Sequence, residues 1–166
     1  MFTLIPAEEN FEVFGLDFSL AMVKEAKKKG VKVILGDAHH LPIKEKAFNA
    51  VMFFTSLEFL DENQALNEAQ RILKNHGWLI LGVHNRLNPW NLYRKIKAKF
   101  KKDSVYKTIK YYSASSLKKL LRKKSFKIEF ISTCVFLPLN SKLEYFLEKL
   151  DLKIGALLVV KAKLQT

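Results

Sequence analysis

The residues that say most about the fold are 12–57, EVFGLDFSLAMVKEAKKKGVKVILGDAHHLPIKEKAFNAVMFFTSL. This stretch contains three short apolar runs, at Glu12–Leu16, Val31–Leu35 and Ala50–Phe54. Each run is rich in β-branched or aromatic residues, is too short for a helix, and ends at a polar or turn residue. These properties predict three β-strands.

The segment between the first two strands has the pattern of an amphipathic helix. In Leu20–Lys29, LAMVKEAKKK, Leu20 and Val23 fall on one face and lysines on the other. Ser19 is placed to cap the start of this helix, and Gly30 stands at its C-terminal capping position. A strand, a helix and a strand joined by tight connections predict a βαβ unit and therefore a parallel sheet.

Two of the predicted strands end in an acidic residue. Asp17 follows the first strand and Asp37 follows the second. Ligands of open α/β sheets bind at the carboxyl ends of the strands, so both acids are candidates for ligand binding. From the residues alone, Asp17 is equally well a loop acid or a helix cap, and a Gly-Asp pair favours a turn in any protein.

Four motifs, in this order, resemble those of class I S-adenosylmethionine-dependent methyltransferases: GLDFS at 15–19, GDAHHLP at 36–42, FNAVMFFTSLEFL at 48–60 and EAQRILKNHGWLILGVHNR at 68–86. The match is best to members that methylate small molecules such as quinones, lipids and other metabolites. The resemblance implies one α/β domain over residues 1–166. It would be a Rossmann-like, mostly parallel sheet with helices on both faces and a C-terminal antiparallel strand pair. S-adenosylmethionine would be the cofactor and S-adenosylhomocysteine the product.

The resemblance places cofactor contacts at three strand ends. Asp17 would accept hydrogen bonds from the ribose hydroxyls, and Asp37 would take the adenine amino group while the Ala38 N–H meets a ring nitrogen. Phe18 and Met22 would form an apolar wall beside the adenine, or would belong to the core. The full expected set is Asp17, Phe18, Ser19, Met22, Asp37, Ala38, Phe54 and Thr55.

Expected contacts with the methyl acceptor follow the later strands. Glu58 and His84 stand where the family places substrate contacts, and either is a general base if it reaches an acidic proton; otherwise they are a loop acid and a strand-end histidine. The expected set is Glu58, His84, Asn85 and Tyr112. No catalytic group is assigned, because an activated methyl donor mainly requires orientation and exclusion of water. His39 and His40 predict no metal site, since no third ligand stands at metal spacing.

Other elements follow from the same kinds of pattern. Further helices are predicted at Phe2–Asn10, Asp61–Leu73, Pro89–Lys102, Ser113–Lys124 and Lys142–Leu150, and further strands at Phe48–Phe54, Trp78–Val83, Phe126–Phe136 and Ala156–Leu164. The helix at 89–102 is predicted to be amphipathic, with Leu92, Ile96 and Phe100 at helical spacing among lysines. Trp90 and Tyr111, with Tyr112, form an aromatic lid over the substrate or pack in the core.

The family's first strand and Gly-rich loop have no counterpart in this sequence. Phe2–Asn10 resembles the helix that follows them, so we expect a truncated version of a methyltransferase. Without that strand, backbone groups in the middle of a sheet would be left unpaired, at about 1–3 kcal/mol each. Three outcomes are expected alternatives: the flanking strands pair directly, another chain supplies the strand, or the sequence is a fragment of a longer protein.

The net charge of +13 is distributed unevenly. Residues 86–127 hold 15 Lys and Arg and one acid, Asp103, which gives 15 − 1 = +14 and leaves −1 for the rest. Such a segment attracts nucleic acid, acidic lipid head groups or a phosphorylated substrate, or is simply a solvated lysine surface. The sequence has no apolar run long enough to span a membrane and no secretory signal, and its single Cys134 suits a reducing compartment. We therefore expect a cytoplasmic location.

Three functions are compatible with these features. The first is transfer of a methyl group from S-adenosylmethionine to a small molecule. The second is a non-catalytic methyltransferase-like subunit that needs an oligomeric or strand-donating partner. The third is a nucleic-acid-binding or RNA-methylating protein that uses the basic segment Arg86–Lys127. The third is disfavoured because the sequence contains no RNA-binding module.

Overall fold

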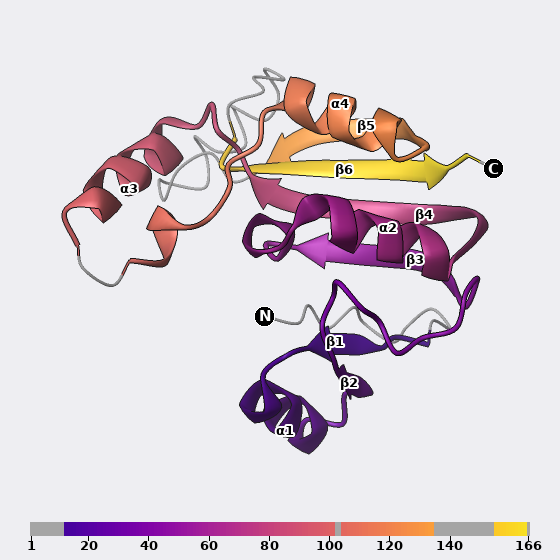
Figure 1. Ribbon diagram of the computed structural model, residues 1–166. Coiled ribbons are helices and arrows are strands. Elements are labelled where there is room, and N and C mark those ends of the chain that lie inside the picture. The colour runs from indigo at the N-terminus through magenta and orange to yellow at the C-terminus, as the bar shows by residue number, and fades with distance from the viewer. Residues whose placement is uncertain (1–11, 102–103, 135–154, 166) are drawn as a thin grey trace.

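A computed structural model of the chain describes residues 12–101, 104–134 and 155–165 (Figure 1). The predicted helices Phe2–Asn10 and Lys142–Leu150 lie outside the described residues, as does the end of the strand predicted to reach Phe136. The other predicted helices and strands all form, with shifts of a few residues at several ends.

The N-terminal part is the predicted βαβ unit. Strands β1 (Gly15–Asp17) and β2 (Val33–Leu35) pair in parallel, with Gly15 opposite Val33. Helix α1 (Leu20–Lys28) connects them and buries Val23 and Ala26. The Ser19 side chain accepts a hydrogen bond from the Met22 N–H, and Gly30 takes the left-handed conformation at φ 75°. Both predicted caps are therefore confirmed, and glycine suits the second because it has no Cβ.

A four-stranded sheet forms the larger part of the molecule. Its order is β3 (Phe48–Phe54), β4 (Leu73–His84), β6 (Leu157–Leu164) and β5 (Phe126–Cys134). β3 and β4 run parallel, whereas β6 runs antiparallel to both of its neighbours. The predicted C-terminal antiparallel pair is confirmed. β4 begins earlier than predicted because Leu73 pairs with Phe48 across an irregularity in the β3–β4 ladder.

Helices α2 (Glu62–Ile72) and α4 (Ala114–Lys123) lie along the four-stranded sheet (Figure 1). Their apolar faces and the sheet residues that meet them form one core, which includes Leu66, Leu117, Leu81 and Val160, all fully buried. Asp61 caps α2 and Ser113 caps α4. Helix α3 (Pro89–Lys99) and the short 3₁₀ helices η1 (Leu57–Phe59) and η2 (Val105–Lys107) complete the described elements.

The α/β, Rossmann-like fold class is confirmed, but the described strands form two separate sheets. No described residue of β1 pairs with β3, so the direct pairing considered as one outcome is wrong. The N-terminal unit nevertheless lies beside β3 (Figure 1), and the rings of Phe14 and Phe48 meet edge to face at 5.9 Å. Among the described strands, β1, three residues long, pairs only with β2.

Candidate functional site

The carboxyl ends of the parallel strands form one side of the molecule. β1 and β2 run in one direction, as do β3 and β4, and their following loops approach one another (Figure 1). His39, after β2, accepts a hydrogen bond through Nε2 from the Asp61 N–H, after β3, at 3.0 Å. Residues that follow β2 and β3 are therefore in direct contact at the end of the strands where α/β folds bind ligands.

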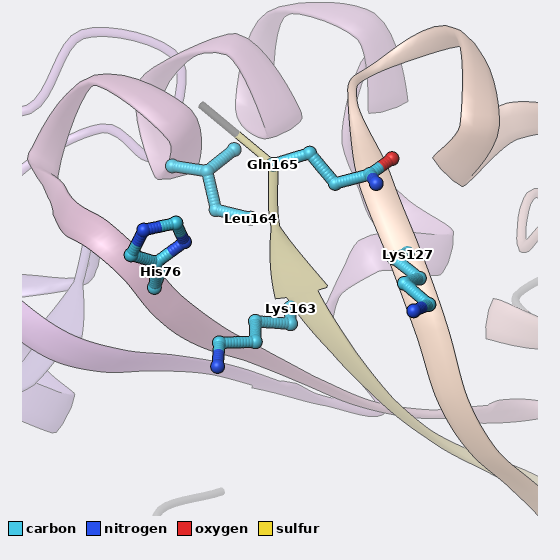
Figure 2. Close-up of a pocket in the computed structure, with 5 residues that line it drawn as sticks. All are labelled: His76, Lys127, Lys163, Leu164 and Gln165. Atoms are coloured by element: carbon cyan, nitrogen blue, oxygen red, sulfur yellow. The ribbon is translucent and has the colours of Figure 1, made fainter.

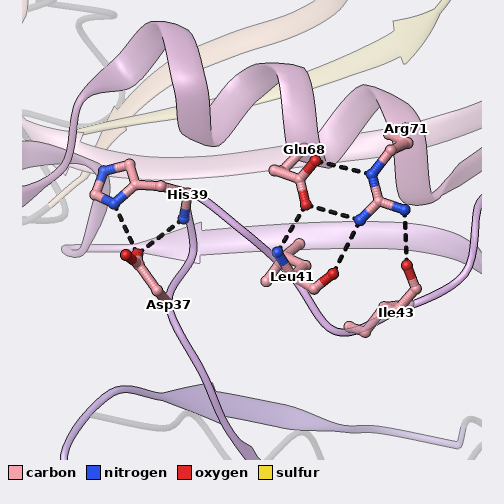
Figure 3. A network of polar contacts seen from close by, with 6 residues as sticks. All are labelled: Asp37, His39, Leu41, Ile43, Glu68 and Arg71. Atoms are coloured by element: carbon pink, nitrogen blue, oxygen red, sulfur yellow. Dashed lines mark hydrogen bonds and ion pairs between the residues drawn. The ribbon is translucent and has the colours of Figure 1, made fainter.

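A polar clamp holds the loop after β2 against α2 (Figure 3). Glu68 accepts a hydrogen bond from the Leu41 N–H at 2.7 Å, and Arg71 donates to the carbonyl oxygens of Leu41 and Ile43. Two further hydrogen bonds join Arg71 to Glu68, and they lower the pKa of the Glu68 carboxyl to about 2. This clamp links the two sheets through side chains that the sequence alone did not single out.

Asp17 lies at the end of β1 and is half-buried. Its Oδ1 accepts a hydrogen bond from the Ser19 N–H at 2.8 Å, so one oxygen shapes the turn into α1. Its Oδ2 accepts no hydrogen bond from the described residues. Phe18 is 84% exposed and Met22 is 43% exposed, so neither is a core residue. Both apolar side chains are accessible to a ligand beside Asp17.

Asp37 stabilises a turn and also lies at the carboxyl end of β2, where a ligand would bind. Its Oδ1 accepts hydrogen bonds from the N–H of His39 at 2.9 Å and faces His39 Nδ1 at 2.7 Å. The backbone hydrogen bond from His39 is the main reason that the pKa of Asp37 lies below its usual value. The charged, exposed carboxylate is thus fixed in direction at the end of the segment that also contains Ala38.

The residues after β3 have an unusual backbone. Thr55 has φ 47°, in the left-handed region that a β-branched residue rarely adopts, and its N–H donates to the Gly82 carbonyl at 2.7 Å. Such a conformation costs on the order of 1–3 kcal/mol and is typical of functional sites. The Phe54 ring lies over Gly82, where an added Cβ would come within 2.5 Å of it. The sequence pattern did not predict a strained backbone at Thr55.

Glu58 and His84, predicted separately, form a pair. Glu58 is 2% exposed on η1, and its Oε1 accepts the backbone N–H of His84 at 2.7 Å and lies 2.9 Å from His84 Nδ1. With Nδ1 bound to the carboxylate, the imidazole presents Nε2 as its acceptor. This carboxylate–imidazole arrangement is suited to taking up a proton.

Aromatic rings surround this pair. The rings of Tyr106 and Tyr111 meet the His84 imidazole edge to face, with centroids 6.4 Å and 6.0 Å away. Among the described residues, Glu58 Oε2 and the Tyr111 hydroxyl are buried without a hydrogen-bond partner. Burial raises the pKa of Tyr111, so the hydroxyl stays protonated. Unpartnered buried polar atoms are rare and require an explanation, of which a bound ligand is one.

The two other expected acceptor residues have structural roles. Asn85 is fully buried and donates through Nδ2 to the Gly155 carbonyl at 2.8 Å. Tyr112 lies in the core, and its hydroxyl donates to Glu62 Oε2 at 2.7 Å. Burial, followed by this hydrogen bond, raises the pKa of Tyr112 well above its usual value. The neighbouring Tyr111 faces His84 instead. The sequence alone does not show which of the two adjacent tyrosines lies at the site.

Two other features lie apart from this arrangement. In the described part of the chain, no group of three His, Cys, Asp or Glu side chains is placed to hold a metal ion. An open hollow lies at the opposite end of the sheet, where β4 begins and β6 ends, and is lined by His76, Lys127, Lys163, Leu164 and Gln165 (Figure 2). It contains none of the predicted site residues.

Comparisons with known proteins identify the family of the chain. A family model described as a methyltransferase domain matches residues 2–81. The crystal structure of an S-adenosylmethionine-dependent methyltransferase from Thermotoga maritima, described as a possible histamine N-methyltransferase, is similar with a TM-score of 0.72. It is 30% identical, over 90% of this chain and 72% of that one. The chain belongs to the S-adenosylmethionine-dependent methyltransferase family.

Two sequence relatives extend the comparison. An uncharacterised protein of Methanocaldococcus jannaschii is 33% identical over 114 residues, which are 68% of this chain and 55% of that protein. A demethylmenaquinone methyltransferase of Thermotoga maritima is 37% identical over 75 residues, 43% of this chain and 33% of that enzyme. The chain thus spans about half of the first relative and a third of the second.

Proposed function

We propose that this chain takes part in the transfer of a methyl group from S-adenosylmethionine to a small-molecule acceptor. The observation that carries the proposal is the Glu58–His84 pair, buried beside unpartnered polar atoms at the strand ends where Asp17 and Asp37 also lie. Family membership supports the cofactor, and the site chemistry supports the acceptor class.

The residues at the ends of β1 and β2 fit the adenosine part of the cofactor. Asp17 retains one oxygen for ribose hydroxyls after it has bound Ser19, and Phe18 and Met22 offer exposed apolar surface next to it. Asp37 presents a charged, fixed carboxylate for the adenine amino group, and the N–H of Ala38, the next residue, would meet a ring nitrogen. Phe54 and Thr55 would line the methionine end.

Glu58 and His84 would act on the acceptor. When bound, S-adenosylmethionine supplies a methyl group activated by its positively charged sulfur. We assign to His84 Nε2 the uptake of the proton that an acceptor oxygen or nitrogen loses as it is methylated. Glu58 Oε1 accepts a hydrogen bond from Nδ1 and stabilises the imidazolium that results, as the carboxylate does in other carboxylate–histidine pairs that act as general bases. Tyr106 and Tyr111 would pack against the acceptor and exclude water.

The surroundings of the pair favour a ring-bearing acceptor with a hydroxyl or amine. Aromatic side chains pack well against rings, and Glu58 Oε2 and the Tyr111 hydroxyl supply polar partners. Demethylmenaquinone and histamine, which appear in the names of two similar proteins, are both cyclic small molecules. A strand-donating or oligomeric partner stays a prediction, and the β1 and β3 edges are where it would act.

Calorimetric titration with S-adenosylhomocysteine tests the cofactor half of the proposal. We expect micromolar binding by the chain and a loss of about tenfold or more in Asp17→Asn, which keeps an oxygen for the Ser19 N–H but loses the charge that ribose hydroxyls prefer. Glu25→Gln, on the exposed side of α1, is the matched control and should bind as the parent does. If the folded chain does not bind S-adenosylhomocysteine, the proposal that this chain binds the cofactor without a partner is refuted.

A further inference from the structure

Helix α3 directs its apolar side toward solvent. Leu92 is 54% exposed, Ile96 49% and Phe100, at the C-cap, 87%, whereas the buried residues of the helix are Asn91 and Ala98. At about 100° per residue, the three apolar positions span roughly 80° on the side opposite to Asn91 and Ala98. The sequence predicted this amphipathic helix, and the structure reverses the usual direction of its apolar face.

Lysines border the apolar stripe on both sides. By helical spacing, Lys95 and Lys99 fall on one side of it and Lys97 on the other, and residues 89–101 contain no acid. Tyr93, 48% exposed, stacks on Trp90 with ring centroids 5.3 Å apart and adds an aromatic edge to the stripe. An ordinary surface helix would place its lysines, not leucine and phenylalanine, farthest from the core.

The helix stands out from the body of the protein. Figure 1 shows α3 projecting beyond the ends of β3 and β4, away from the layer formed by α2 and α4. Leu87 and Val105, in the segments that flank α3, are 61% and 59% exposed, so apolar surface continues on both sides of it. None of the described helices has the length and apolarity needed to cross a membrane.

We propose that α3 binds the surface of an anionic lipid membrane. Leu92, Ile96 and Phe100 enter the boundary between head groups and acyl chains, and the flanking lysines contact the acidic head groups. The charge complementarity is strong, since residues 86–101, which contain α3, hold six Lys and Arg and no acid. A nucleic acid fits less well, because the exposed side of α3 carries Leu92 and Ile96, where contacts with phosphates would require cations. This inference does not depend on the proposed reaction.

Co-sedimentation with vesicles tests it. We expect binding of the full chain to vesicles of equal phosphatidylglycerol and phosphatidylcholine, and at least tenfold weaker partitioning to phosphatidylcholine alone. The triple variant L92S/I96S/F100S should lose about tenfold or more of its partitioning, whereas Phe130→Ser, an equally exposed apolar residue on β5, should change it less than twofold.

Three further variants separate the apolar contribution from the charge contribution. Phe100→Ser alone leaves the helix interior unchanged and should weaken binding about threefold. K95Q/K99Q should weaken binding to the acidic vesicles more than K118Q/K119Q, which removes the same charge from α4. The proposal is overturned if the triple variant partitions like the parent, if both lysine pairs have equal effects, or if duplex DNA displaces the chain from the vesicles.

Discussion

The N-terminal βαβ unit and the four-stranded sheet belong to one fold but are stabilised differently. In β1 and β2 no residue is buried, and α1 buries only Val23 and Ala26. In the larger sheet, Leu79, Leu81 and Val160 are fully buried beneath α2 and α4. The proposed adenosine residues thus lie on the part with the smaller core, and the proposed proton acceptor on the part with the larger one.

This difference shows how a weakly packed unit is held in a functional position. The loop after β2 is attached to α2 by Glu68 and Arg71, whose hydrogen bonds fix direction without a large apolar contact (Figure 3). Ligand-binding segments are commonly drawn from regions of low local stability. We infer that binding of a ligand across both parts would stabilise the N-terminal unit more than the larger sheet.

Truncation of the large core should have the greatest effect on stability. Leu81→Ala removes a fully buried side chain between β3 and β6, and we expect the free energy of unfolding to fall by about 2–5 kcal/mol. Urea denaturation followed by circular dichroism measures this. A loss below about 1 kcal/mol would show that the larger sheet is not the main source of stability.

Removal of the clamp should act mainly on the N-terminal unit. Arg71→Ala leaves the carbonyls of Leu41 and Ile43 and the Glu68 carboxylate without their partner, at about 1–2 kcal/mol because the pair is partly exposed. Hydrogen exchange should accelerate over residues 33–43 and stay unchanged over 78–84. Equal acceleration of both segments would contradict the separation of the two parts.

Lys28→Ala is the matched control for that variant. Lys28 also contacts an acid three residues away, Glu25, but both side chains are largely exposed. Exposed pairs of this kind contribute little, so its effect on stability and on exchange should be within about 0.5 kcal/mol. A larger effect would mean that loss of any ion-paired cation, rather than loss of the clamp, destabilises the N-terminal unit.

Acid should weaken the clamp within a defined range of pH. The pKa of Glu68 is lowered in the folded state to about 2 from an ordinary value near 4.5, chiefly by its hydrogen bonds with Arg71. Its contribution to stability is therefore complete above about pH 4.5 and is lost as the pH falls toward 2. Glu68→Gln should flatten the stability profile between these values, and an unchanged slope would exclude this role.

Much of the fold could be predicted because local pattern and tertiary packing agree. The apolar runs and the cap at Ser19 formed as predicted, and the helix predicted at Asp61–Leu73 forms with Leu66, Ala69 and Ile72 buried. The start of β4 could not be predicted, since Leu73 completes the spacing of α2 in sequence but pairs with Phe48 in the sheet. The direction of the apolar face of α3 depends on tertiary contacts, which periodicity does not contain.

The sequence predicts where the candidate site residues lie in the fold better than it predicts which side chains contact one another. Topology places the acids and the residues after β3 and β4 at strand ends, so the positions of Asp17, Asp37, Glu58 and His84 could be predicted, whereas their binding roles stay predictions. That Glu58 binds His84, that Tyr111 rather than Tyr112 faces it, and that Arg71 fixes the β2 loop depend on side chains distant in sequence. The strain at Thr55 comes from its positive φ, which the sequence does not indicate because threonine rarely adopts this conformation.

Hydrogen exchange with and without S-adenosylhomocysteine tests most directly whether the two parts form one site. We predict that the ligand slows exchange together at residues 17–22, after β1, and at 52–58, around the end of β3, and leaves residues 126–132 unchanged. Slowing at only one of the first two segments would contradict a site shared by both sheets. Slowing at neither, with the chain folded, would show that the described residues do not bind the ligand without a further strand or partner.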